Sequence, residues 1–101
     1  MRLSEQQQVL ICRALKKHFG EQSRIWLFGS RVDDNARGGD IDLYIEPEVQ
    51  SPAGIVDARI AAMVDIYRQL GEQKIDLVIN RFAGPQLAIY DVAKENGVEL
   101  K

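Results

Sequence analysis

Apolar residues recur along this chain at two spacings, and each spacing predicts a different kind of element. Apolar side chains every three or four positions predict a helix over residues 4–19, which Ser4 begins with a capping box and Gly20 ends. A short apolar and aromatic run at residues 24–28 predicts a buried strand. Residues 40–46 alternate in their first half, which predicts a second strand.

The second half of the chain continues this pattern. Residues 51–70 predict a helix because a Ser-Pro pair opens the segment and a glycine follows it. The apolar stripe expected to face the core of this helix comprises Ile55, Val56, Ile60, Met63, Val64, Tyr67 and Leu70. Residues 74–79 predict a third strand, residues 84–96 a last helix opened by a Gly-Pro pair, and residues 98–100 a short edge strand.

The order of these elements predicts an α+β fold in which helices cover a small mixed β-sheet. The strands at residues 24–28 and 40–46 are joined by a loop at residues 29–39, so they are expected to pair antiparallel. The 101 residues are enough for one domain, which we expect to span residues 1–101.

Charge and composition narrow the classes of function. A net charge of −2 argues against binding of duplex nucleic acid, which normally requires a basic face. Cys12 is the only cysteine, so neither an intramolecular disulfide nor a paired-cysteine zinc site can form. No apolar run approaches the roughly 20 residues of a membrane span, and the first residues lack the apolar core of a signal peptide. The expectation is a cytoplasmic protein that does not enter a membrane.

Three acidic residues are the candidates for chemistry. Asp40 and Asp42 lie two positions apart on a predicted strand, which places both carboxylates on one face. Neighbouring carboxylates raise each other's pKa unless a cation lies between them, and oxygen ligands suit Mg²⁺ or Mn²⁺. Asp76 lies within another apolar strand, and a neighbouring position in the sheet would complete a three-carboxylate cluster.

A phosphate site is indicated beside these acids. Gly29 and Ser30 end the first strand, and glycine lets the backbone approach a ligand closely. A chain that turns into a helix at Ser30 would present free N–H groups to an anion, and Arg31 is the nearest side chain that could add a phosphate contact. A metal site next to a phosphate site predicts phosphoryl or nucleotidyl transfer.

These motifs together resemble the DNA polymerase β-like nucleotidyltransferase superfamily, and the short length resembles its minimal nucleotidyltransferase (MNT) branch. The Gly-Ser pair, the Asp-Ile-Asp motif and Asp76 follow in the order that the superfamily shows. The nine residues between Ser30 and Asp40 are one fewer than is usual in that branch.

This resemblance implies a fold, a reaction and a partner. A nucleoside triphosphate, expected to be ATP, would bind through its β- and γ-phosphates at Gly29 and Ser30. Asp40 and Asp42 would hold two Mg²⁺ ions, or Mn²⁺ as the alternative, and Asp76 would ligate the catalytic ion and activate the attacking hydroxyl. Nucleoside monophosphate, expected to be AMP, would pass to a hydroxyl with release of pyrophosphate. Proteins of this branch often pair with a small helical HEPN-domain toxin, whose tyrosine accepts the AMP, and the chain would then be an antitoxin.

Other interpretations stay open at this point. Asp40 and Asp42 are also compatible with solvent-facing acids at a strand end, and Asp76 with an ion pair to Lys74 or Arg81. The domain could neutralise a partner by contact alone, without catalysis. Acid clusters also occur in metal-dependent nucleases, although the glycine turn and acidic pI favour a triphosphate. A homo-oligomer is a further arrangement that the small size allows.

Overall fold

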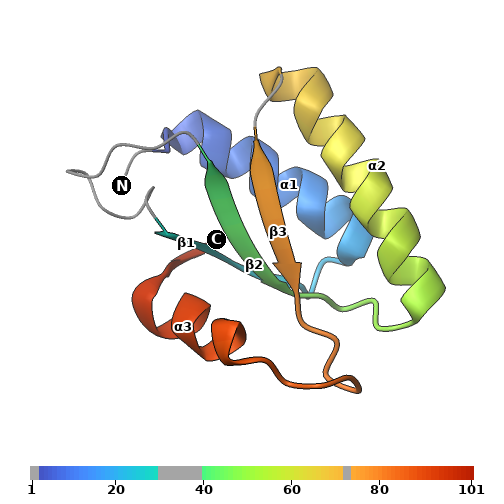
Figure 1. Cartoon of the computed structure of the whole chain (residues 1–101). Helices are drawn as coiled ribbons and strands as arrows, with labels where there is room; N and C mark the ends of the chain where they lie inside the picture. The colour runs from blue at the N-terminus through green and yellow to red at the C-terminus, as the bar shows by residue number, and fades with distance from the viewer. Residues whose placement is uncertain (1–2, 30–39, 72–73) are drawn as a thin grey trace.

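The computed structural model describes residues 3–29, 40–71 and 74–101 of the chain (Figure 1). These residues form three helices and four strands, whose order confirms the expected α+β fold with a mixed sheet. In chain order the elements are α1 (Glu5–Phe19), β1 (Arg24–Phe28), β2 (Ile41–Glu46), α2 (Pro52–Leu70), β3 (Ile75–Ile79), α3 (Ala88–Asn96) and β4 (Val98–Leu100).

The four strands form one sheet in the order β3-β2-β1-β4. β1 pairs antiparallel with β2, as the sequence predicts, and also with β4. β2 pairs parallel with β3. The connecting helix α2 carries the chain back to the end of the sheet at which β2 begins. The parallel pairing brings the first residues of β2 and β3 to the same end of the sheet.

The two faces of the sheet are covered by different helices (Figure 1). α1 and α2 pack together on one face, where the largest apolar cluster lies. The side chains that the sheet contributes to this cluster include Ile25, Leu27, Ile41, Leu43, Ile45, Ile75 and Leu77. α3 covers the other face, where Trp26, Tyr44, Tyr90 and Ala93 form a smaller buried cluster. The alternating strand residues therefore divide between an apolar core and a mixed aromatic and polar layer.

Local hydrogen bonds explain where the first two helices begin and end. The hydroxyl of Ser4 accepts a bond from the backbone N–H of Gln7, and the side chain of Gln7 accepts one from the N–H of Ser4, which confirms the capping box. The hydroxyl of Ser51 accepts a bond from the N–H of Gly54 at the start of α2. Gly71, with φ of 79°, ends α2 by donating its N–H to Tyr67.

Three sequence predictions differ from the structure. β2 and β3 each begin one residue later than predicted, because Asp40 and Lys74 precede the ladder that starts with a bond from Ile41 N–H to the carbonyl of Lys74. The last helix begins at Ala88 rather than near Gly84. Residues 85–87, which the prediction placed in its first turn, are not helical, and a separate turn at residues 81–84 precedes them. The side chain of Gln86 donates to the carbonyl oxygens of Arg81 and Gly84 in that turn.

The apolar stripe predicted for α2 is the third difference. The buried side chains of this helix are Ile55, Ala58, Ala62 and Ile66. Val56 and Ile60, which the prediction placed in the core, are 57% and 60% exposed. Alanine allows the helix to pack closely against the sheet, so the face with the smaller side chains is the one that faces the core.

Among the described residues, no helix combines the length and the apolar character that crossing a membrane requires.

Candidate active site

Asp42 and Asp76 lie side by side at one end of the sheet. They are register partners in the parallel pairing of β2 and β3. Both side chains project from the face that α3 partly covers, since their neighbours Leu43 and Leu77 belong to the core on the opposite face. Two residues that are far apart in the sequence thus present carboxylates to one place.

Within the described part of the chain, both acids at this end of the sheet are accessible to solvent. Asp76 is exposed and Asp42 is half-buried. On the other side of Asp42, its register partner in β1 is Phe28, a half-buried side chain that packs against the aromatic cluster. The buried part of that cluster starts two register pairs further along the sheet, at Trp26 and Tyr44. A ligand can therefore reach the acid pair without displacing core side chains.

The surroundings of Asp42 oppose its ionisation. Burial raises the pKa of Asp42, and the negative charges of Asp76 and Asp40 and a hydrogen bond with Asp76 raise this pKa further. The positive charge of Lys74 acts in the opposite direction. A carboxylate in this position is stabilised by a proton or by a cation, so the pair has the electrostatic character of a cation site.

The backbone of Gly29 packs directly against the carboxylate of Asp42. A Cβ atom at position 29 would overlap Asp42 Oδ2, and the φ of 76° at Gly29 also disfavours any other residue. Glycine is therefore required here by the contact with Asp42, and the phosphate contact that the sequence predicts for Gly29 stays a prediction. Ser30 and Arg31, the other two predicted phosphate contacts, lie outside the described residues.

Asp40 lies at the edge of this group. Its carboxylate pairs with Lys74, with 3.4 Å between Asp40 Oδ2 and Lys74 Nζ. The ion pair that the sequence suggested between Lys74 and Asp76 is thus formed by Asp40 instead. Across residues 3–29, 40–71 and 74–101, no three His, Cys, Asp or Glu side chains are grouped around one point where a metal ion could sit. The expected cluster of three carboxylates takes the form of a close pair, Asp42 and Asp76, with Asp40 beside it.

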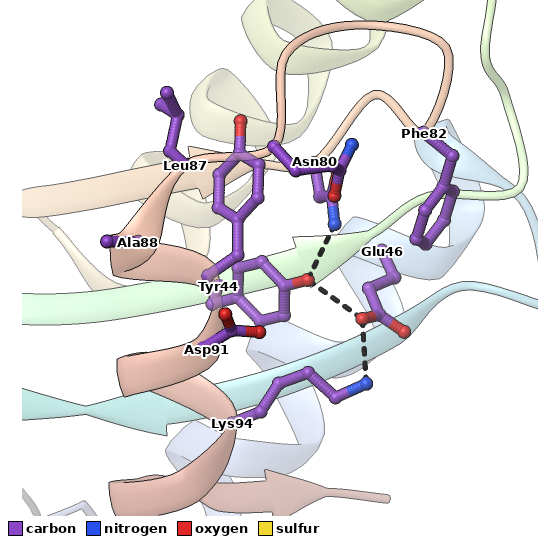
Figure 2. A pocket seen from close by; sticks show the side chains of 10 residues that line it. Tyr44, Glu46, Asn80, Phe82, Leu87, Ala88, Asp91 and Lys94 are labelled. Atoms are coloured by element: carbon purple, nitrogen blue, oxygen red, sulfur yellow. Dashed lines mark hydrogen bonds and ion pairs between the residues drawn. The ribbon is translucent and has the colours of Figure 1, made fainter.

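A separate cavity of about 440 Å³ lies at the other end of the same sheet face, beside the start of α3 (Figure 2). Its lining includes Glu46, which is four positions beyond Asp42 on β2 and so about 13 Å along the strand. Glu46 and Asp42 are therefore too far apart to act on one reacting atom.

A chain of polar contacts lines this cavity (Figure 2). Asn80 Nδ2 donates to the hydroxyl of Tyr44 at 3.0 Å, and this hydroxyl donates to Glu46 Oε2 at 2.8 Å. Lys94 Nζ of α3 lies 3.1 Å from the same Glu46 oxygen. Burial is the main cause that raises the pKa of Tyr44 to about 12, so its hydroxyl remains a donor at neutral pH. No sequence pattern indicates this network, because its members come from β2, from the residue after β3 and from α3.

No protein-family model matches the sequence, and no curated protein matches it. The resemblance to minimal nucleotidyltransferases therefore depends on the motif residues and their arrangement.

Proposed function

We propose that the protein is a metal-dependent nucleotidyltransferase that transfers AMP from ATP to a hydroxyl group on a partner protein. The observation that carries this proposal is the register pairing of Asp42 with Asp76, with Gly29 packed against Asp42. We propose that the acid pair binds a cation and that the chain after Gly29 approaches a phosphate. The order of the motif residues, which resembles the MNT branch, supports the same reaction.

The residues at this site fit a Mg²⁺ ion. Asp42 and Asp76 would hold it, with Asp40 as a further carboxylate if it leaves Lys74. The donors are carboxylate oxygens, which Mg²⁺ prefers, and a cation would relieve the repulsion that raises the pKa of Asp42. When bound, such an ion supplies charge neutralisation on the phosphates and lowers the pKa of the attacking hydroxyl.

The proposed reaction is a single displacement at phosphorus. The oxygen of the acceptor hydroxyl forms a bond to the α-phosphorus of ATP, the bond from that phosphorus to the bridging oxygen breaks, and pyrophosphate leaves. We assign to Asp76 the acceptance of the hydroxyl proton, because its carboxylate is exposed. Asp42, half-buried next to Gly29, would hold the cation that binds the phosphates, since a carboxylate alone repels them.

The proposed acceptor is a small helical protein of the HEPN type encoded beside this chain. The test is to incubate the protein with that neighbour, Mg²⁺ and ATP labelled on its α-phosphate, and to follow the label. Asp42→Asn and Asp76→Asn are each expected to lower the rate of transfer by about 10²–10⁴-fold. Asp91→Asn, on α3 beside the separate cavity, is the matched control and should leave the rate within about twofold. Transfer that survives Asp42→Asn would contradict the proposal.

A binding module that neutralises a partner by contact is the second candidate function. It is favoured by exposed apolar side chains on and beside α3, where Leu87, Ile89 and Val92 are 53%, 38% and 45% exposed. This candidate predicts that a chain with both Asp40→Asn and Asp42→Asn neutralises the partner fully, whereas Val92→Glu weakens neutralisation. If the protein acts as an enzyme, the chain with Asp40→Asn and Asp42→Asn should instead fail to neutralise the partner.

A further inference from the structure

The outer side of α2 carries a continuous row of apolar side chains, which we name the α2 stripe. It consists of Val56, Ile60, Val64 and Tyr67, which are 57%, 60%, 43% and 39% exposed. Their spacing of four, four and three positions places them on one side of a helix. The core-facing residues Ile55, Ala58, Ala62 and Ile66 lie on the other side. α2 is therefore apolar on both its buried side and its solvent side.

A row of this kind is typical of a helix that a second helix covers. A 19-residue helix is about 28 Å long, and the α2 stripe runs along its middle. Twofold homodimers are the commonest oligomers of soluble proteins, and their interfaces are more apolar than the rest of the surface. The charged residues beside the α2 stripe indicate which helix can cover it and in which direction.

Asp57 and Arg68 lie on the same flank of the α2 stripe, near opposite ends. They are eleven positions apart, which is close to three full turns, so their side chains lie almost in line. A second copy of α2 laid antiparallel would bring each Asp57 beside the Arg68 of the other copy. In a parallel twofold pair the two copies of this flank would lie on opposite sides of the contact, so Asp57 and Arg68 would not meet.

The apolar residues share the symmetry of these charges. Ile60 and Val64 are equally spaced about residue 62, and Val56 and Tyr67 have nearly the same midpoint. One twofold axis next to residue 62 would therefore place Ile60 against Val64 of the second copy, and Val56 against Tyr67. The spacing of the apolar residues and the positions of the charges both allow the α2 stripe to pair with a second copy of itself.

We propose that a second copy of this chain docks antiparallel along the α2 stripe to form a twofold dimer, with two Asp57–Arg68 ion pairs beside the apolar contact. α2 covers the face of the sheet opposite to that from which Asp42 and Asp76 project (Figure 1). Dimerisation through α2 leaves both acid pairs open, so the inference does not depend on the proposed function.

Sedimentation equilibrium of the full chain over a wide concentration range tests the dimer. Wild type should sediment as a dimer, and Ile60→Glu should raise the dimer dissociation constant roughly a hundredfold or more, because the interface would bury an unpaired charge. Val92→Glu, at a similarly exposed apolar position on α3, is the matched control and should not change the constant. Circular dichroism checks that both variants fold.

A charge exchange tests the antiparallel arrangement itself. Asp57→Arg and Arg68→Asp should each weaken the dimer about tenfold, and the two together should restore it to nearly the wild-type affinity. A monomer at every concentration would overturn the proposal, even if the stripe then proved to bind a different protein. A dimer that Ile60→Glu leaves intact, or that the double exchange fails to restore, would also overturn it.

Discussion

Asp76 lies directly opposite Asp42 in the parallel pairing of β2 and β3, although 33 residues separate them in the sequence. The crossover through α2 creates this relationship, and the period of two in each strand sends both carboxylates to the same face. Among the described residues, Phe28 lies on the β1 side of Asp42, and Asp76 is exposed on β3. The two carboxylates therefore differ in their access to water.

The pKa of Asp42 makes the stability of the protein depend on pH. Because this pKa is raised in the folded state, the folded chain holds the proton more tightly than the unfolded chain. The resulting stabilisation is complete below the ordinary pKa of 3.8 and is lost as the pH rises through the raised value. In a chelating buffer, Asp42→Asn should therefore be more stable than wild type at pH 7 by a few degrees in Tm, where about 1 kcal/mol corresponds to roughly 4–8 °C.

Thermal unfolding of both proteins across this pH range checks the prediction. The difference in Tm should shrink as the pH approaches 3.8. A difference that stays constant with pH would mean that the charge of Asp42 costs nothing in the fold.

Mg²⁺ should stabilise the folded protein by binding at the acid pair. A ligand that binds only the native state at 100 times its Kd adds about 2.7 kcal/mol to the free energy of unfolding. Wild type should gain Tm on addition of Mg²⁺, and Asp42→Asn and Asp76→Asn should lose most of this gain. Asp91→Asn keeps the acid pair and should respond like wild type, whereas equal gains in all four proteins would indicate binding elsewhere.

Gly29→Ala should destabilise the protein more than Gly71→Ala. Both glycines have a φ near 77°, but an added Cβ at Gly71 meets nothing within 4 Å, whereas at Gly29 it overlaps the carboxylate of Asp42. The backbone cost alone is about 1–3 kcal/mol, and the overlap should add roughly 1–3 kcal/mol. Chemical denaturation measures both values.

The control for this comparison is the same glycine change in an Asp42→Ala background. With the carboxylate removed, Gly29→Ala should cost about as much as Gly71→Ala. If Gly29→Ala costs as much in the Asp42→Ala background as in wild type, the cost arises from the backbone conformation alone.

Tyr44→Phe should lower the free energy of unfolding by about 1–3 kcal/mol. The change removes the acceptor of the bond from Asn80 and the donor of the bond to Glu46, and Asn80 Oδ1 already has no partner among the described residues. Tyr67→Phe is the control, since Tyr67 is 39% exposed and its change should cost less than about 0.5 kcal/mol. Similar losses at both positions would show that the network contributes little.

Much of this fold could be predicted from the sequence because its signals are local. The capping box at Ser4, the Ser-Pro start of α2 and the glycine at its end all act within a few residues. The start of α3 could not be predicted in this way, because the side chain of Gln86 holds a preceding turn that the Gly-Pro pair also allows. The side of α2 that faces the core could not be predicted either, because this helix has apolar residues on two sides.

The candidate site could also be predicted only in part from the sequence. Asp42 and Asp76 could be singled out because charged residues are rare within apolar strands, but their pairing depends on a register that arises only in the folded sheet. The pairing of Asp40 with Lys74 also depends on that register, since the two residues precede strands that become neighbours. The cavity network at Glu46, Asn80 and Lys94 joins residues from three elements and leaves no pattern in the sequence.

The parallel register of β2 and β3 ties the position of the acid pair to the packing of the apolar core. A slip of β3 by one residue would turn Asp76 into the apolar layer and expose Ile75 and Leu77 to water. That register would lose the burial of two large apolar side chains, so packing of the core favours the register that brings the two carboxylates together. The stability of the fold and the assembly of the acid pair are thereby linked.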